Sequence, residues 1–315
     1  MDSGSALLDF AEGISAVVQT TTSSVVAESN CYLVAGSGRD VHLIDPGEAK
    51  EGNWRRLIDG LATRGRELAD VASIIVTHLH EDHLGIADRV RRASGATLVM
   101  LSAEQRALDE RGATDDSAAR LERWGVPVER RPELLAVARA RAERHPVQAD
   151  LLMEPGESVA LGPRCAVAVW TPGHTRGHLC VDLPDDGLVF TGDHLLPSLY
   201  PGIGLGGRGA TNPLVDYYAS LAAVADLGSR RGLPGHGGVI ADVATRVAQT
   251  RRHHERRGEE ITAAVDERGR LTTWELAARL RWSAGWQNLR NYSLDSALRQ
   301  VDMHLERKAQ TSMTT

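Results

Sequence analysis

The sequence predicts an α/β fold in which helices pack against β-sheet. The run Ile74-Ile75-Val76 is apolar and β-branched, which is typical of a buried strand. A helix is expected next, over residues 84–93, and Ala96–Leu101 is predicted to be a second buried strand. This order favours α/β layering over an all-β barrel. With 315 residues, the chain is long enough for one main domain and a smaller appendage.

The first part of the chain is predicted to be rich in strands. Short apolar or alternating segments bounded by turn residues indicate strands at residues 14–20, 30–35 and 41–44. Residues 54–66 carry apolar side chains at helical spacing, so a helix is expected to lead into the strand at 74–76.

Residues 102–150 depart from this pattern. They are rich in Arg, Glu and Ala, with few strong core positions, and they predict an inserted helical segment. Two interpretations stay open. The insert is either a lid over a functional site or a solvated helical connector.

Two β-hairpins are predicted after the insert. Their strands are expected at residues 158–161, 164–170, 179–183 and 188–191. The Gly-rich segment 197–212 has no regular periodicity and is suited to a loop that faces a substrate. Asn212 and Pro213 then supply an N-cap and a first helical residue, so a helix is expected from there to about Gly228.

The C-terminal part, residues 241–315, is predicted to be a helical domain appended to a main domain of residues 1–240. Helices are expected at 241–266, from the capping box Thr272-Thr-Trp-Glu275 to about 282, and at 293–308. The second and third helices carry apolar stripes, which need a partner surface. We therefore expect contact with the rest of the chain or with a second subunit, so that an oligomer formed through this domain is one predicted outcome.

Ligand-type side chains follow the strand at 74–76 directly. His78, His80, Asp82 and His83 fall within six residues. His78 and His80, two apart in extended chain, point to the same side, whereas Asp82 and His83 come after a turn and can face a second position. Imidazole and carboxylate are ligands suited to zinc and its neighbours. This layout predicts two metals, and it argues against a polar loop of merely solvated histidines.

Three further ligand-type residues occur later in the chain, each beside a glycine and after a short apolar segment. They are His174 in Thr-Pro-Gly-His-Thr, Asp193 in Phe-Thr-Gly-Asp-His and His236 in Leu-Pro-Gly-His-Gly. Glycine lets the backbone approach a metal without an intervening side chain.

The motifs HxHxDH, GH, GD and GH, in this order, resemble those of the metallo-β-lactamase superfamily over residues 14–240. The resemblance implies a four-layer αββα sandwich and a site for two metal ions. By analogy, one ion is held by His78, His80 and His174, the other by Asp82, His83 and His236, and Asp193 bridges them. The tail resembles the winged-helix appendage of a subgroup that includes a mitochondrial endoribonuclease, and some polyketide-releasing thioesterases share that subgroup's core.

Four other roles are expected around this site. Asp82 is also the candidate catalytic residue, since it can orient the attacking hydroxide. Asp45 closes the strand at 41–44, where it either opens a turn or, as the resemblance implies, braces the metal-binding loop. His178 and His194 are candidates for contact with a ligand residue or the substrate, and ordinary polar packing is the alternative.

The expected activity is hydrolysis of a small ester, thioester or lactone by a hydroxide that bridges two divalent ions. Zinc is the expected metal, with iron or manganese as alternatives. A metal-dependent endoribonuclease or other phosphodiesterase is the alternative function, supported by the Arg-rich run at 251–257. A metal-dependent regulator is a third, weaker hypothesis. Acidic residues interleaved with the Arg-rich run at 251–257 favour a solvated helix face there over a surface that binds nucleic acid.

Composition agrees with a small-molecule enzyme of the cytoplasm. The formal net charge is −6 and the pI is about 6.1, which do not suggest a nucleic-acid partner. The first ten residues are acidic and lack an apolar run, so no signal peptide is expected there. No stretch is apolar over the length that a membrane helix needs, so a membrane location is not expected.

Overall fold

The computed structural model describes residues 7–23, 26–112, 116–142, 147–207, 209–268 and 271–313. Parts of the predictions fall outside these residues: the first six residues and residues 24–25 of the predicted main domain, residues 113–115 and 143–146 of the insert, Arg208 of the Gly-rich segment, and residues 269–270 and 314–315 of the predicted C-terminal domain. The fold is described below for the remainder.

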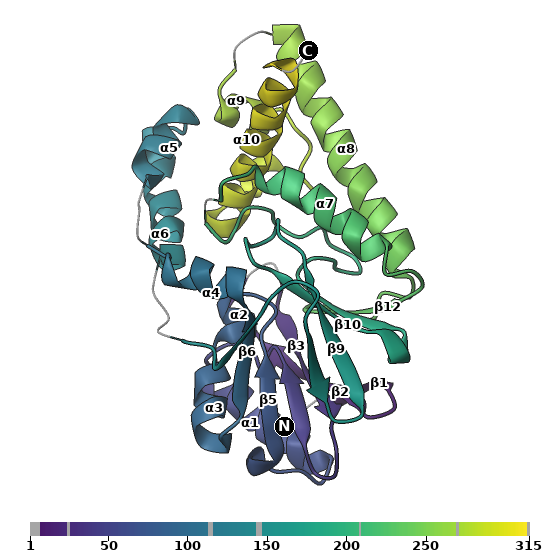
Figure 1. Ribbon diagram of the computed structural model, residues 1–315. Helices are drawn as coiled ribbons and strands as arrows, with labels where there is room; N and C mark the ends of the chain where they lie inside the picture. Colours follow the sequence, from purple (N-terminus) through teal and green to yellow (C-terminus); the bar gives the residue numbers. More distant parts are fainter. Residues whose placement is uncertain are drawn as a thin grey trace.

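Two β-sheets form the centre of the molecule (Figure 1). The first has the order β1-β2-β3-β4-β5-β6-β7, antiparallel up to β4 and parallel beyond it. Its strands are Leu7–Ala11, Ile14–Thr20, Glu28–Ala35, Val41–Ile44, Val71–Ile75, Thr97–Leu101 and Leu151–Met153. The second has the order β12-β11-β10-β9-β8, in which only β11 and β12 are parallel. Its strands, from β8 to β12, are Ser158–Leu161, Arg164–Trp170, Leu179–Leu183, Leu188–Gly192 and Arg231–Pro234.

Helices cover the outer faces of both sheets, which gives the expected four layers. The α-helices, from α1 to α10, are Glu51–Thr63, Glu81–Leu84, Ala87–Ser94, Ser102–Asp109, Ser117–Arg123, Arg131–Ala142, Pro213–Ala225, Val243–Arg268, Thr273–Ala277 and Asn291–Met313. Side chains of α1 and α3 pack on the first sheet, and those of α7 and the start of α8 pack on the second. No helix in the described part of the chain is long and apolar enough to cross a membrane.

Alternate side chains of each strand pack on opposite faces of its sheet, which explains how the sheets and helices pack together. In β5, Ile74 packs toward α1 and α3, whereas Ile75 packs between the sheets. In β10, Leu179 lies between the sheets and Cys180 faces α7. Successive side chains of a strand point to opposite faces, so these two strands, buried on both faces, are mostly apolar.

The predicted strands agree closely with the observed ones, but one helix differs. The structure replaces the helix expected at 84–93 with α2 and α3, and α2 begins at Glu81 with His80 as its N-cap. Asp82 and His83 therefore lie within the single helical turn of α2, whereas the spacing predicted that they come after a turn of the loop. The separation occurs near Gly85, where a Cβ atom would lie 2.5 Å from the Ala49 nitrogen.

The insert and the C-terminal helices share one apolar core. Leu121 and Trp124 of the insert are buried with Leu276 of α9 and Leu298 of α10. Leu134 of α6 is buried in the same core, so the expectation of a solvated connector is wrong for α5 and α6. The apolar stripes of the tail find their partner surface within the same chain, and Figure 1 shows α5 and α6 on the same side of the sandwich as α10.

Helix α9 is shorter than predicted, ending at Ala277 instead of about residue 282. The capping box at its start is present, with Thr272 and Glu275 each accepting from the other's backbone N–H. Its end is set by Trp282, whose indole N–H donates to the Ala277 carbonyl at 2.8 Å. The Ala277 carbonyl also accepts from the Leu280 N–H, so helix α9 ends in a tight turn.

The shared core predicts a large effect of truncating Leu298. This side chain is fully buried among the insert and the C-terminal helices. We expect Leu298→Ala to lower the free energy of unfolding by about 2–5 kcal/mol, since lost transfer energy and a residual cavity add together. Val128, 73% exposed, offers the matched control, and Val128→Ala should change stability by less than about 0.5 kcal/mol. Urea unfolding would measure both, and equal effects would contradict the shared core.

A buried histidine makes the helical region sensitive to acid. The His254 ring lies on α8 with no hydrogen-bond partner among the described residues, 5.5 Å from the Tyr217 ring of α7. Burial lowers the pKa of His254 to about 3, and His253, His304 and Arg257 add to the effect. The unfolded chain takes up this proton near pH 6.5, so stability is complete above that pH and is lost as the pH falls toward 3.

We expect His254→Leu to reduce this loss. Between about pH 7 and about pH 5, the wild-type protein should lose about 2 kcal/mol more than the variant, because only the wild type gains a proton at position 254 on unfolding. Denaturant unfolding at both pH values would measure the difference. Identical pH dependence in the two proteins would show that His254 is not the group responsible.

Candidate metal centre

The loop after β5 presents the first two imidazoles. Leu79 is buried in the core between the first sheet and its helices, so its neighbours His78 and His80 point the other way, toward the second sheet. The chain here remains held to the sheet, since the Val76 N–H donates to the Val99 carbonyl at 3.0 Å.

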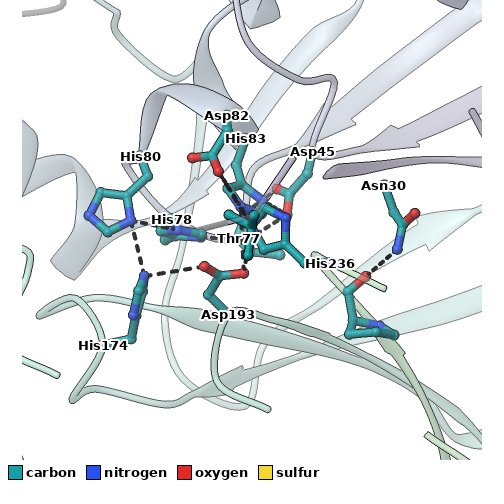
Figure 2. Close-up of polar contacts among 12 residues, drawn as sticks. Asn30, Asp45, Thr77, His78, His80, Asp82, His83, His174, Asp193 and His236 are labelled. Carbon is teal, nitrogen blue, oxygen red and sulfur yellow. Dashed lines mark hydrogen bonds and ion pairs between the residues drawn. The ribbon is translucent and has the colours of Figure 1, made fainter. Parts of the chain in front are cut away.

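Three histidines form one group of candidate ligands. His174, from the loop after β9, places Nε2 3.0 Å from Nδ1 of His80. Nε2 of His78 lies 3.0 Å from the same His80 nitrogen. All three ligand atoms lie within 4.8 Å of one another, which is close enough for one metal ion. Figure 2 shows the three rings converging from two different loops.

A second group contains Asp82, His83 and His236. Nε2 of His83, on α2, lies 3.2 Å from Nε2 of His236, which follows β12. Asp82 Oδ2 is 3.3 Å from His236 Nε2 and 3.9 Å from His83 Nε2. The parallel pairing of β11 and β12 and the close approach of Gly235 bring His236 here, where a Cβ on Gly235 would lie 2.5 Å from the His83 ring.

Asp193, at the end of β11, lies between the two groups. One carboxylate oxygen, Oδ2, is 3.6 Å from His174 Nε2. The other, Oδ1, is 3.3 Å from His236 Nε2 and 3.6 Å from His83 Nε2. The carboxylate therefore has one oxygen toward each group, as Figure 2 shows. All seven residues expected to hold metal are brought together.

Contacts on the outer side of the rings fix where their protons lie. His174 Nδ1 donates to the Gly202 carbonyl at 2.6 Å and His236 Nδ1 to the Glu28 carbonyl at 2.5 Å. His83 Nδ1 bonds to an Asp45 carboxylate oxygen at 2.8 Å. Because these acceptors can only accept, Nε2 of each ring, when the ring is neutral, faces the centre with its lone pair.

Such an arrangement needs positive charge between the rings. A single hydrogen on His80 Nδ1 can serve only one of its two neighbours at 3.0 Å, His78 Nε2 or His174 Nε2. In addition, Asp193 Oδ1 is buried and accepts no hydrogen bond among the described residues. Inward lone pairs, an orphaned carboxylate oxygen and outer hydrogen bonds are what a metal site of nitrogen and oxygen ligands requires. The donor set therefore fits divalent metal ions.

The electrostatics of the site differ between the candidate ligands. Although burial lowers the pKa of His83 and His236, the nearby carboxylates of Asp82 and Asp193 outweigh it and raise both values, so a metal ion would take the place of protons on these two rings. Burial opposes the charged form of Asp82, but the nearby His83 and His236 outweigh it and hold the pKa of that carboxyl well below its usual range. Burial, joined by the neighbouring imidazoles, lowers the pKa of His78 well below its usual value. An ionised carboxylate and a neutral imidazole are the forms that bind metal.

Asp45 touches the metal-ligand loop from outside. Its carboxylate accepts from the Thr77 N–H at 2.7 Å and from the Thr77 hydroxyl at 2.6 Å, besides the contact with His83. Asp45, His78 and His83 also lie close enough to hold an ion, but the Asp45 oxygens already have these partners. Its φ of 54° is rare for a non-glycine residue and indicates local strain at this corner. The geometry favours the bracing role over a simple turn.

His178 and His194 differ in what they contact. His178 Nε2 accepts from the Asp193 N–H at 3.1 Å, and its Nδ1 lies 2.8 Å from the Thr171 hydroxyl. It thereby positions the backbone of Asp193. The His194 ring is buried beside Tyr217, and neither of its nitrogens has a hydrogen-bond partner among the described residues. The packing alternative is the better account of His194.

Sequence reasoning missed several side chains that hold the ligand loops. The Thr77 hydroxyl lies 3.0 Å from His78 Nδ1, which links this ring to Asp45. Asn30 of β3 donates to the carbonyl of Pro234, two residues before His236, at 2.9 Å (Figure 2). Tyr32 of the same strand donates to that carbonyl at 2.7 Å. The two contacts with Pro234 join residues about two hundred positions apart, so no local pattern could indicate them.

The Gly-rich segment lies against His174 as an irregular loop. The Leu205 N–H donates to the His174 carbonyl at 2.9 Å, and the Gly202 carbonyl accepts the hydrogen bond from His174 Nδ1 described above. A cavity of about 500 Å³ lies between this segment, α5 and α10. Trp124 of the insert and Met303 of α10 are among its walls. The insert and the C-terminal helices thus enclose space beside the loop that contacts a candidate ligand.

Comparisons with known proteins agree with this geometry. The sequence profile of the metallo-beta-lactamase superfamily matches residues 25–236. An atrochrysone carboxyl ACP thioesterase of Aspergillus fumigatus is 28% identical over 241 residues, which cover 75% of this chain and 59% of the thioesterase. The chain thus matches only about three fifths of the length of that relative.

Two solved structures extend the likeness over the C-terminal helices. A metallo-beta-lactamase family protein from Thermus thermophilus is 29% identical, with a TM-score of 0.79 over 96% of this chain and 95% of that one. A beta-lactamase domain protein from Burkholderia ambifaria is 21% identical, with a TM-score of 0.80 over 99% and 90% of the two chains, and shows the same fold.

Proposed function

Because the chain belongs to the metallo-beta-lactamase superfamily, a superfamily of metal-dependent hydrolases, we propose that it is a binuclear hydrolase of small thioesters, esters or lactones. The observation that carries the proposal is the meeting of two ligand groups at Asp193, with one oxygen of that carboxylate toward each group. A structural zinc site has its ligand shell closed by protein, whereas a catalytic site keeps a position for water beside its protein ligands, and each group here supplies three protein ligands of its own.

The proposed ligands are the seven residues of the two groups and their bridge. His78, His80 and His174 hold one ion, Asp82, His83 and His236 hold the other, and Asp193 is shared. Divalent ions held there would supply Lewis-acid activation of water and of the scissile carbonyl. Imidazole-rich sites with carboxylates suit zinc, and iron or manganese accept the same donors.

Asp82 has the position expected of the residue that orients the attacking water. Its side chain is 21% exposed, compared with 12% for Asp193, so it is the more accessible carboxylate of the pair. Its low pKa keeps it ionised at neutral pH, as an acceptor of a hydrogen bond requires. His178 holds the Asp193 backbone, and Asp45 holds His83, so both act through other residues.

A thioester is the substrate class with the most direct support. A relative that matches three quarters of the chain is named as a thioesterase for an acyl carrier protein. The cavity beside the Gly-rich segment is lined by both apolar and charged side chains, including Trp124, Met303 and Arg299. None of the seven candidate ligands lines this cavity, so the thioester proposal rests on the relative and not on the cavity.

The phosphodiesterase alternative has less support in the structure. Two arginines of the run at 251–257 are paired with acidic residues on the same helix, Arg251 with Glu255 at 2.9 Å and Arg257 with Glu260 at 2.8 Å. Arg257 is also largely buried against Trp282. Paired and buried arginines are poor ligands for a nucleic-acid backbone.

A substrate panel tests the proposal. Purified protein, assayed with excess zinc, should hydrolyse short acyl thioesters with a kcat/KM at least about tenfold above that for a phosphodiester probe, with little dependence on salt. EDTA should abolish the activity and zinc should restore it. Preferential cleavage of the phosphodiester or of RNA, weakening steeply as salt rises, would instead support the alternative.

A further inference from the structure

A buried carboxylate of the insert touches both loops that carry the three-histidine group. Glu104, in the first turn of α4, is fully buried. Its Oε1 accepts from the Leu79 N–H at 2.8 Å, between His78 and His80. The same oxygen accepts from the Thr175 hydroxyl at 2.7 Å.

The second oxygen of Glu104 completes the link. Oε2 accepts from the Gly177 N–H at 2.8 Å, in the loop that begins with His174. One carboxylate therefore joins the loop after β5, in the first sheet, to the loop after β9, in the second sheet. These are the two loops whose histidines must approach to hold one ion.

The backbone packing at this link is tight. A Cβ atom on Gly177 would lie 2.1 Å from the Glu104 nitrogen and 2.4 Å from the Ala103 carbonyl carbon. Real Cβ atoms never approach backbone so closely, so the loop and the start of α4 meet at a distance that only glycine permits. The position of α4 is thus transmitted directly to the His174 loop.

We propose that Glu104 is a positioning residue of the metal centre, which sets the separation of His78 and His80 from His174 by clamping their two loops. The inference rests on the proposed metal-dependent function. Groups that orient ligands from outside tune metal affinity, and their loss typically weakens it by about 10–100-fold. Glu104 differs from such groups in acting on two loops at once, through backbone and hydroxyl donors and not through a ring nitrogen.

The chemistry of the three contacts makes Glu104→Gln informative. An amide can still accept from Leu79 and Thr175 through its oxygen, but its NH2 group would then face the Gly177 N–H. Two donors cannot bond to each other, so the loop of His174 must move or lose its anchor. The side-chain volume is nearly unchanged.

The next residue offers a matched control. Gln105 is also buried on α4 and makes three hydrogen bonds, to Asp109, Val147 and Ala149, none of them in a metal loop. Gln105→Ala should therefore lower the melting temperature without altering metal affinity. Thr175→Val, which removes only one donor to Glu104, serves as a second test should Glu104→Gln fold poorly.

The experiment measures zinc affinity of metal-free protein by competition with a chelator, alongside the melting temperature. We expect Glu104→Gln to bind one of two zinc ions about 10–100-fold more weakly, Thr175→Val to show a smaller shift in the same direction, and Gln105→Ala to match the wild type. Added zinc should restore much of the activity of Glu104→Gln.

Two results would overturn the inference alone: wild-type zinc affinity in both Glu104→Gln and Thr175→Val, or an equal loss in Gln105→Ala. A wild-type protein that binds no metal would overturn the proposed function and this inference together.

Discussion

Replacing His236 by alanine should reduce thioester hydrolysis by more than about 100-fold and remove one metal ion from the protein. Loss of a group that merely orients a metal ligand lowers metal affinity or activity by about 10–100-fold, so loss of the ligand itself should lower them further. His236 Nε2 lies within 3.3 Å of Asp82, His83 and Asp193, so its removal leaves the second group incomplete. Metal analysis and kcat/KM of the same preparation measure the two effects together.

His254→Leu is the matched control for this variant. It removes an equally buried imidazole whose nitrogens have no hydrogen-bond partner among the described residues. We expect its metal content and activity at neutral pH to remain close to those of the wild type. Full activity in His236→Ala, or an equal loss in both variants, would exclude His236 from the proposed centre.

Asp82→Asn should lower kcat by about 10²–10⁴-fold while changing KM far less. The range is the usual contribution of a positioned acid–base group, and the lost interaction is one that matters most in the transition state. Asparagine keeps the shape of the side chain but removes the negative charge that accepts a hydrogen bond from water. Steady-state kinetics at saturating zinc, with metal content measured in parallel, test the expectation.

Asp88→Asn provides the comparison. Asp88 lies nearby on α3 but pairs with Arg91 and Arg92 at 2.8 Å, outside the candidate centre. Its replacement should change stability by about 1 kcal/mol or less and leave kcat unaltered. An unchanged kcat in Asp82→Asn would remove this residue from the catalytic step.

The strands were the most predictable part of the fold, because their signals are local. The runs 164–170 and 179–183 coincide with β9 and β10, since apolar alternation and flanking turn residues define both ends of each strand. By contrast, α2 has only four residues, which is too short for any helical periodicity to appear. The helical placement of Asp82 and His83 therefore could not be predicted from spacing.

The sequence pattern could not predict which distant segments pack against each other. The stripes on α9 and α10 predicted a partner, but periodicity does not say which distant segment supplies it. The partner is the insert, where Leu121 and Trp124 precede Leu298 by more than 170 positions. Glu104 illustrates the same limit, since a glutamate in a charged helical segment resembles a surface residue until the fold buries it.

The candidate ligand residues could be picked out because they are chemically distinctive and follow strand ends, and the structure brings all seven together. Spacing separated His78 and His80 from Asp82 and His83, but the assignment of the three later residues came from the resemblance, because spacing alone does not show that loops after β9, β11 and β12 meet the loop after β5. Outer contacts such as the Gly202 and Glu28 carbonyls belong to the backbone and leave no signal in residue type.

Metal content is the most direct test of the two-metal centre. Protein purified without chelator, supplied with zinc and freed of excess metal, should contain about two ions per chain by inductively coupled plasma mass spectrometry, and activity should rise in proportion to metal added to the metal-free form. A chain that saturates with one ion, or that is fully active without metal, would contradict the centre proposed here.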